Sequence, residues 1–128
     1  MEPIQVGDEL QTNILEIENI LLDPQYAGKV LCVQTTTSCF APRAYDNVVE
    51  VAKLCKKHGI NHLINSAYGL QCSRITNDIM QASQLGTVDV VVSSTDKNFM
   101  VPVGGSIVYS PQAAKQKDNK QGIIAKIN

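Results

Sequence analysis

"VVSSTDKNFMVPVGG", residues 91–105, joins an apolar, β-branched run to a polar cluster that holds a single lysine, Lys97. The run is typical of a buried strand, and the proline and paired glycines favour a turn before another strand-like segment at residues 105–110. We therefore expect Lys97 to follow the carboxyl end of a strand. In open α/β sheets, ligands bind outside the carboxyl ends of the strands, so this stretch indicates both the fold class and the position of a site.

Strands and helices alternate along the rest of the chain. Three short apolar runs predict buried strands, at residues 29–35, 60–65 and 88–94. Three amphipathic stretches predict helices, within residues 8–22, 45–59 and 73–86. For the first helix Thr12 or Asn13 is available as N-cap, Asp46 is expected to cap the second, and Gly59 to end it.

The order of these elements predicts the sheet. Strands separated by single helices imply right-handed crossovers and a mostly parallel sheet, so the fold class is α/β. The connection between residues 94 and 105 is too short for a helical crossover. The last strand is therefore either antiparallel to its predecessor or not adjacent to it.

Composition limits the kind of protein. The chain has 128 residues, 44% of them apolar and 18% charged, which predicts a single globular domain. A net charge of -1 provides no global basic field, so any contact with RNA must be local. Apolar runs fall far short of the roughly 18 residues of a membrane span, and the acidic amino-terminal stretch has no secretory signal, so we expect no membrane partner and a cytoplasmic location.

The cysteines and the carboxy-terminal region complete this picture. Cys32, Cys39, Cys55 and Cys72 form no CxxC pair and no zinc-ligand spacing with histidine, so reduced thiols and no metal site are expected. Residues 111–122 are polar and rich in lysine, which predicts a solvated, flexible segment.

Three polar clusters follow predicted strands, at residues 35–43, 65–69 and 93–98. Lys97 alone reads as a solvated loop residue, yet a desolvated lysine amine can lose its proton and form a Schiff base with a carbonyl, which is the chemistry of pyridoxal phosphate enzymes. Asn65 is either a turn former or the group that faces a pyridine nitrogen. Ser93 and Ser94 are either local caps or phosphate donors. The chain contains no P-loop and no GxGxxG motif.

Three longer blocks carry a resemblance to a known family. "TTSCFAPR", "INHLINSAYGLQ" and "SSTDKNFMVPVGGSIV" resemble, in order and spacing, the core of the O-phosphoseryl-tRNA(Sec) selenium transferases, the selenocysteine synthases of eukaryotes and archaea. The similarity runs from about "GDELQT" to "GGSIV", which is most of the chain. It implies a fragment of the large domain of fold type I pyridoxal phosphate enzymes, a three-layer α/β/α domain with a mostly parallel sheet that would extend over residues 1–128.

The resemblance also assigns residues. It implies that Lys97 is the Schiff-base lysine and that Asn65 faces the pyridine nitrogen, where most fold type I enzymes have an aspartate. A neutral amide holds the ring but does not lock the nitrogen in its protonated form, which an elimination tolerates. Ser94, Thr37 and Ser38 are the expected donors to the cofactor phosphate. The resemblance also places Gln84 where the family has a basic residue that meets tRNA, which makes Gln84 the implied tRNA contact, without the positive charge.

The implied activity is part of selenocysteine biosynthesis. O-phosphoserine carried by tRNA(Sec) loses phosphate by β-elimination, selenophosphate supplies selenium to Cβ, and Lys97 acts as the general base. The partners implied are this tRNA, selenophosphate and further copies of the chain, as a tetramer of the full-length protein.

The chain is several times shorter than the family's proteins and lacks the phosphate-gripping loop, so we expect the 128-residue chain alone to bind the cofactor weakly. Two alternatives stay open. One is an inactive fragment or a binding or structural module. The other is a different fold type I lyase, such as a cysteine desulfurase or an amino-acid decarboxylase, although these usually carry the aspartate and a histidine beside the lysine.

Overall fold

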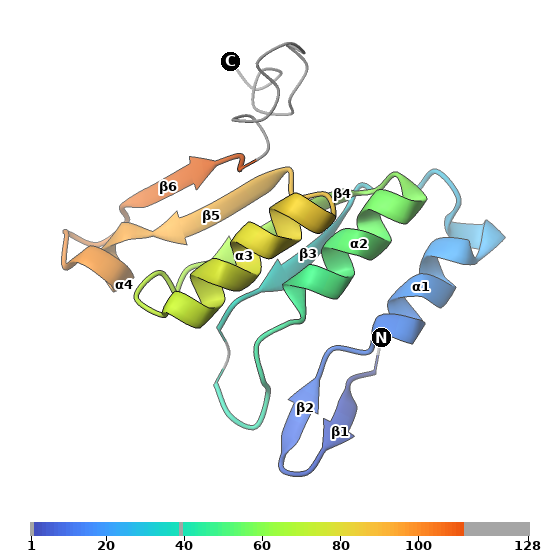
Figure 1. Cartoon of the computed structure of the whole chain (residues 1–128), viewed down its shortest axis with the longest axis horizontal. Coiled ribbons are helices and arrows are strands. Elements are labelled where there is room, and N and C mark those ends of the chain that lie inside the picture. Colours follow the sequence, from blue (N-terminus) through green and yellow to red (C-terminus); the bar gives the residue numbers. More distant parts are fainter. Residues whose placement is uncertain (1, 39, 112–128) are drawn as a thin grey trace.

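A four-stranded sheet forms the centre of the computed structural model, which describes residues 2–38 and 40–111 (Figure 1). Its strands are β3 (Cys32–Thr36), β4 (Asn61–Ser66), β5 (Val90–Ser94) and β6 (Ser106–Tyr109), and they lie in that order. β3, β4 and β5 are parallel, and β6 runs antiparallel to β5. The mostly parallel α/β sheet is confirmed, and of the two alternatives for the last strand the adjacent, antiparallel one is correct.

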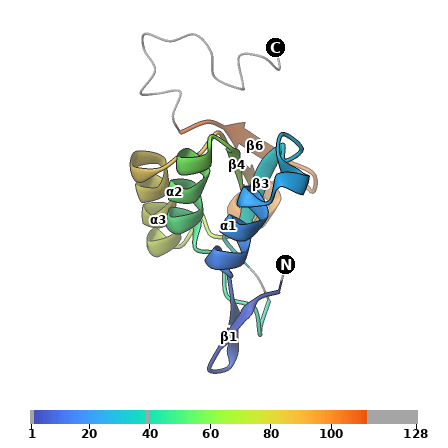
Figure 2. The same cartoon turned by 90° about the vertical axis from the view of Figure 1, so that its right-hand side faces the viewer.

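Helices α1 (Ile14–Leu22), α2 (Val48–His58) and α3 (Ser73–Leu85) pack on one face of this sheet (Figure 2). Their main core cluster joins α2 and α3 to the sheet and has seven buried members, Val48, Ala52, Ile64, Ile79, Ala82, Val88 and Val91. α1 lies beside α2, where Ile17 packs against Val51, Leu54 and Cys55. Burying these apolar stripes is the main stabilising contribution to the fold.

The opposite face of the sheet is only partly covered. Strand alternation places Leu63, Asn65 and Val92 on that face, where they are half-buried, and Val108 beside them is 55% exposed. Within residues 2–38 and 40–111 no helix packs there, so two of the three predicted layers are present in the described part of the chain.

Four elements were not foreseen from the sequence. A hairpin of β1 (Ile4–Val6) and β2 (Glu9–Gln11) precedes α1, with Gly7 at a φ of 59° in its two-residue turn. A 3-10 turn, η1 (Pro24–Tyr26), follows α1. A five-residue helix, α4 (Thr95–Phe99), occupies the stretch that contains Lys97.

The helix ends follow the predicted caps with one correction. Asn13 caps α1 by accepting from the backbone N–H of Glu16 at 3.1 Å, and Gly59 ends α2 in the left-handed conformation at a φ of 66°. The prediction that Asp46 caps α2 is wrong, because Asn47 accepts from the N–H of Glu50 at 3.2 Å and takes that role.

Other predictions concern thiols, membranes and the carboxy-terminal region. Cys32, Cys55 and Cys72 are free thiols, and Cys39 lies outside the described residues. The helices that the structure describes are all too short or too polar to cross a bilayer. The predicted flexible segment at residues 111–122 lies, from residue 112 onward, outside the described range.

Gly86 is the point where α3 turns back toward β5 against the backbone of α2. A Cβ added there would lie 2.2 Å from the carbonyl carbon of Ala52, and the next N–H, of Thr87, donates to the Ala52 oxygen at 3.0 Å. The absence of a side chain at Gly86 therefore sets how closely the α3–β5 turn approaches α2.

We expect Gly86→Ala to destabilise the chain by about 1–3 kcal/mol, because the backbone must shift to admit the methyl group. The free energy of unfolding, measured by urea titration, tests this. Gly59→Asn is the matched control, since Gly59 has open space around its Cα and asparagine tolerates a positive φ. Equal effects of both variants would contradict the packing argument.

His62 is a fully buried histidine of β4 with a fixed tautomer. Its Nδ1 lies 3.1 Å from the carbonyl oxygen of Thr87, which can only accept, so Nδ1 carries the hydrogen and Nε2 accepts from the Thr35 hydroxyl at 2.9 Å. Burial lowers the pKa of His62 below its ordinary value of 6.5, although the Thr87 carbonyl opposes this.

Stability should therefore fall on mild acidification. Below about pH 6.5 the unfolded chain binds a proton at this position that the folded chain does not, so the free energy of unfolding decreases as the pH falls toward the folded pKa. Urea titrations at pH 7.5 and 5.5 measure the loss. His62→Gln should reduce the difference in the free energy of unfolding between the two pH values. An undiminished difference in His62→Gln would show that other groups cause it.

Candidate active site at the carboxyl edge of the sheet

Lys97 lies on α4, three residues beyond the end of β5. Its side chain is 40% exposed, and Nζ is 3.4 Å from the hydroxyl of Ser94 and 3.9 Å from a carboxylate oxygen of Asp96. The ammonium also lies over the ring of Tyr68, 5.6 Å from its centroid. The lysine is thus held against the sheet edge by a hydroxyl, a carboxylate and an aromatic face.

Ser94 and Asp96 form a short polar pair next to the lysine. The Ser94 hydroxyl donates to the Asp96 carboxylate, and this hydrogen bond is the main reason why the pKa of Asp96 is lowered. A serine hydroxyl carries one hydrogen. Because this hydrogen is donated to Asp96, the Ser94 oxygen acts as an acceptor toward Lys97. Ser94 can donate to a phosphate only if its hydrogen bond to Asp96 is broken.

Asn65 shares the edge and the sheet face with Ser94. It is paired in register with Val92, two residues before Ser94, so the two side chains point to the same side, away from α2 and α3. The Asn65 side-chain oxygen accepts from the backbone N–H of Ala67 at 3.1 Å. Because Lys97 reaches the Ser94 hydroxyl, the structure brings Asn65, Ser94 and Lys97 to one face of two neighbouring strand ends.

Thr37 and Ser38 lie elsewhere. Thr37 is buried on the helix-covered side, where its hydroxyl donates to the Tyr68 carbonyl at 2.8 Å and lies 3.2 Å from the Ser66 hydroxyl. Ser93, opposite Ser66 in the sheet register, also faces the helices. These hydroxyls are therefore not brought together with Asn65 and Ser94. Two contacts join the sets: the Thr37 N–H donates to the Asn65 backbone carbonyl at 3.1 Å, and Tyr68 has its carbonyl on Thr37 and its ring beneath Lys97.

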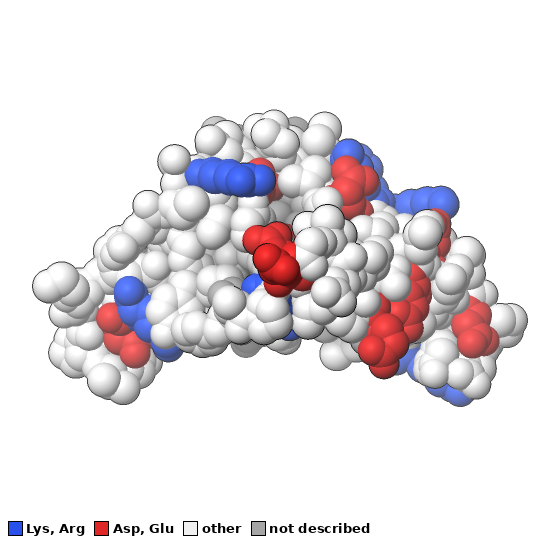
Figure 3. All heavy atoms as spheres, turned by 90° about the horizontal axis from the view of Figure 1, so that it is seen from below, with Lys and Arg blue, Asp and Glu red and all other residues white. Residues whose placement is uncertain are grey.

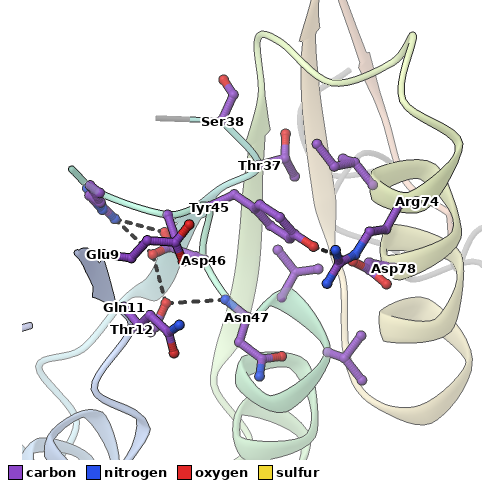
Figure 4. A pocket seen from close by; sticks show the side chains of 15 residues that line it. Glu9, Gln11, Thr12, Thr37, Ser38, Tyr45, Asp46, Asn47, Arg74 and Asp78 are labelled. Carbon is purple, nitrogen blue, oxygen red and sulfur yellow. Dashed lines mark hydrogen bonds and ion pairs between the residues drawn. The ribbon is translucent and has the colours of Figure 1, made fainter. Parts of the chain in front are cut away.

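A pocket of about 720 Å³ opens on the helix side of the edge (Figure 4). Ser38 and Thr37 line one wall, and Tyr45 reaches across from the β3–α2 loop to α3. The Tyr45 hydroxyl donates to Asp78 at 3.3 Å, and the Arg74 guanidinium lies 5.8 Å from the Tyr45 ring centroid. Neither Asn65 nor Lys97 lines this pocket.

Asp46 organises the same pocket from its other side. Its buried carboxylate accepts from the Thr36 N–H at 2.8 Å, from the Thr12 hydroxyl at 2.9 Å and twice from the Arg43 guanidinium at 2.8 and 3.0 Å. One side chain thereby ties the end of β3, the loop that follows it and the residue after β2 to one point.

Gln84 lies far from these residues along the sheet. It is exposed in the last turn of α3, near the edge where β5 begins, whereas Lys97 follows the edge where β5 ends. On the face of the molecule seen in Figure 3, basic and acidic side chains are interspersed among uncharged ones and form no continuous basic surface.

The residues that sequence reasoning missed are structural partners of the predicted ones. Asn98, Tyr68 and Asp46 stand inside or beside the quoted blocks, but their roles depend on contacts between segments 10 to 34 residues apart. A buried polar residue next to a reactive one is the signal that could have pointed to Asn98.

Comparison of folds gives the class of protein. The chain superposes on mouse CSAD in apo form with a TM-score of 0.63 at 16% identity, covering 95% of this chain and 28% of that one, which shows the fold alone. With its mostly parallel sheet, the chain has the α/β fold of part of the large domain of the fold type I pyridoxal phosphate enzymes.

Comparison of sequences gives the family. The profile described as "O-phosphoseryl-tRNA(Sec) selenium transferase, SepSecS" matches residues 1–123, and the chain belongs to that family. The relative of this name from Dictyostelium discoideum is 50% identical over 107 residues, and that from Leishmania donovani is 57% identical over 83. An archaeal O-phosphoseryl-tRNA(Sec) selenium transferase structure superposes with a TM-score of 0.80 at 38% identity.

The chain corresponds to only part of these proteins. The match to the Dictyostelium relative covers 84% of this chain and 22% of that protein. For the Leishmania relative the two shares are 65% and 14%, and for the archaeal structure they are 88% and 26%. Donors that a complete site requires can therefore lie on parts of the family's polypeptide with no counterpart in these 128 residues.

We expect Asp46→Asn to lower the free energy of unfolding by about 1.5–3 kcal/mol, because hydrogen bonds to a charged acceptor are lost and an amide faces the Thr36 N–H. Urea titration measures the loss. Asp78→Asn is the control: this residue lines the same pocket but, within the described residues, accepts one long hydrogen bond, from Tyr45 at 3.3 Å. It should change stability by no more than about 0.5 kcal/mol. Similar losses in both would contradict the central role of Asp46.

Proposed function

We propose that this chain carries the cofactor lysine of an O-phosphoseryl-tRNA(Sec) selenium transferase, which converts O-phosphoseryl-tRNA(Sec) to selenocysteinyl-tRNA(Sec) with pyridoxal 5'-phosphate and selenophosphate. The observation that carries the proposal is the placement of Lys97 and Asn65 at one edge and on one face of the sheet, in a chain of this family. The argument has two parts, the fit of the cofactor and the roles of the side chains.

The residues present fit the reactive end of pyridoxal phosphate. The Lys97 amine would hold the aldehyde carbon, and the Asn65 amide, on the same face, would hold the pyridine nitrogen. The phosphate end fits less well. Among the described residues the Ser94 hydroxyl donates to Asp96 and the Thr37 hydroxyl donates to Tyr68. Ser38, the third predicted donor, lines the helix-side pocket, which neither Asn65 nor Lys97 lines.

Each side chain then has a defined task. When bound, the cofactor supplies an electron sink for the charge that develops at Cα of the amino acid. Lys97 Nζ takes the α-proton as general base, and the Ser94 oxygen and the Asp96 carboxylate hold the amine in place between transfers. Asn65 orients the ring without adding a negative charge, which suits an elimination that expels phosphate.

The remaining parts of the proposal concern substrate and setting. O-phosphoserine on tRNA(Sec) is the proposed substrate and selenophosphate the selenium donor, in the cytoplasm and in a homo-oligomer of the full-length protein. The exposed Gln84 of α3 is the proposed tRNA contact of this chain. With a net charge of -1 the chain supplies no broad electrostatic attraction, so such contacts must be local.

Reductive trapping tests the proposal. The chain is incubated with pyridoxal 5'-phosphate and sodium borohydride, and the labelled peptide is identified by mass spectrometry. We expect most of the label on Lys97, and a clear loss of total label in Lys97→Ala, because an amine held beside the cofactor forms the Schiff base more readily than a free surface amine. Lys53→Ala, which removes a helix-surface amine paired with Glu50, is the control and should leave the label unchanged.

Label on Lys53, Lys56 or Lys57 in place of Lys97 would reject the assignment. Without reduction we expect weak binding to the 128-residue chain, since the phosphate carries close to two charges and finds few donors here. Tight, saturable binding that Lys97→Ala abolishes would show that the described residues grip the phosphate better than their hydrogen bonds indicate.

A further inference from the structure

The helix that carries Lys97, α4, is too short to be stable in isolation. α4 has five residues, and a single isolated turn is unstable in water because its nucleation costs more than its hydrogen bonds return. Its contacts with the rest of the chain must therefore fix the direction in which Lys97 points. On one side, the Thr95 N–H donates to the Gly105 carbonyl at 2.9 Å, and a Cβ on Gly105 would lie 2.2 Å from the Thr95 hydroxyl oxygen.

On the other side the contact runs through Asn98. This side chain is 6% exposed, and its amide donates to the Ser94 carbonyl at 2.5 Å and to the Ala67 carbonyl at 2.9 Å. The backbone carbonyl of Asn98 accepts from the Gln71 side-chain amide at 2.6 Å. Both amide hydrogens of one buried side chain are thus used, one on the carbonyl of Ser94 at the end of β5 and one across to the β4–α3 loop.

Ala67, which Asn98 contacts in the β4–α3 loop, also contacts the Asn65 side chain. The Ala67 peptide gives its N–H to the Asn65 side-chain oxygen at 3.1 Å, and Ala67 itself takes the Asn98 amide on its carbonyl. Hydrogen bonds therefore connect the Asn65 amide, by way of Ala67, to Asn98, the residue next to Lys97.

We propose that Asn98 is a positioning residue, which sets Lys97 relative to Asn65 by clamping α4 to the β4–α3 loop. The proposal rests on the proposed function in assigning the amine and the amide to one cofactor. The clamp requires a side chain with two hydrogen-bond donors, since residue 98 faces the carbonyl oxygens of Ser94 and Ala67. Asn98→Asp keeps the shape and removes both donors, and Asn98→Ala removes shape and donors together.

The first measurement needs no cofactor. Amide hydrogen exchange is followed by mass spectrometry in peptides covering residues 66–71 and 95–99. In Asn98→Asp and Asn98→Ala we expect both segments to exchange at least about tenfold faster together, because buried carbonyls lose their donors, while α2 keeps its protection. Asn61→Ala is the matched control. The Asn61 amide donates to the Leu31 carbonyl at 3.1 Å at the start of β4, so this variant should leave exchange in both segments unchanged.

The second measurement is the distribution of label after trapping with pyridoxal 5'-phosphate and borohydride. The share of label on Lys97, relative to the helix lysines, should fall at least about fivefold in Asn98→Asp and remain at the wild-type level in Asn61→Ala, since only the former removes donors beside the amine. If wild-type Lys97 takes no label, the proposed function fails, and the exchange measurement still decides whether Asn98 is the clamp.

The outcomes that overturn the proposal are specific. Unchanged exchange in both segments in Asn98→Asp would show that the clamp lies elsewhere, and faster exchange with an unchanged share of label would show that the clamp does not position the amine. If the Asn98 variants unfold, Gln71→Ala is the alternative. It removes the hydrogen bond from the Gln71 side chain to the Asn98 backbone carbonyl and leaves the Asn98 side chain intact. It should speed exchange of residues 95–99 and lower the Lys97 share. No change in either would equally reject the clamp.

Discussion

The parallel register between β4 and β5 is the constraint on which the carboxyl edge depends. It pairs Asn65 with Val92 and Ser66 with Ser93, so Asn65 and Ser94 point to one face while Ser66 and Ser93 point to the other. Since side chains alternate strictly along a strand, a slip of one residue would turn Asn65 into the helix layer and break the site. The packing of Ile64 and Val91 against α2 and α3 resists that slip, because it would expose both.

Much of this arrangement could be predicted from the sequence, since it follows from short-range pattern. β-branched runs mark the three parallel strands, Gly59 marks the end of α2, and the blocks around Asn65 and Lys97 mark the strand ends that carry the candidate site. α4 could not be predicted, because five residues give no periodicity and its stability comes from Asn98 and Gly105. The role of Asp46 could not be predicted either. Its position before α2 suggested an N-cap, whereas its carboxylate accepts from Thr12 and from the Thr36 N–H, 34 and 10 residues away in the sequence.

The hydroxyl groups show why residue type alone misleads about a site. Ser94, Thr37 and Ser93 are all near strand ends, and each was a reasonable phosphate donor. Alternation and hydrogen bonding separate them, since Ser94 gives its hydrogen to Asp96, Thr37 to the Tyr68 carbonyl, and Ser93 faces the helices. What the edge offers in the described residues is a held amine and a held amide, with few donors for an anion. This agrees with a chain that matches about a quarter of the archaeal family structure.

β6 has a consequence for how the chain behaves at high concentration. It is the last strand of the sheet in the described residues, and Ile107 and Val108, on opposite faces of the strand, are 48% and 55% exposed. Its outer row of backbone N–H and C=O groups therefore lies beside apolar side chains on both faces, the combination that templates strand addition from another molecule. Gly105, whose carbonyl accepts from the Thr95 N–H of α4, directly precedes β6, so the strand next to the lysine helix is also the one with this exposed apolar edge.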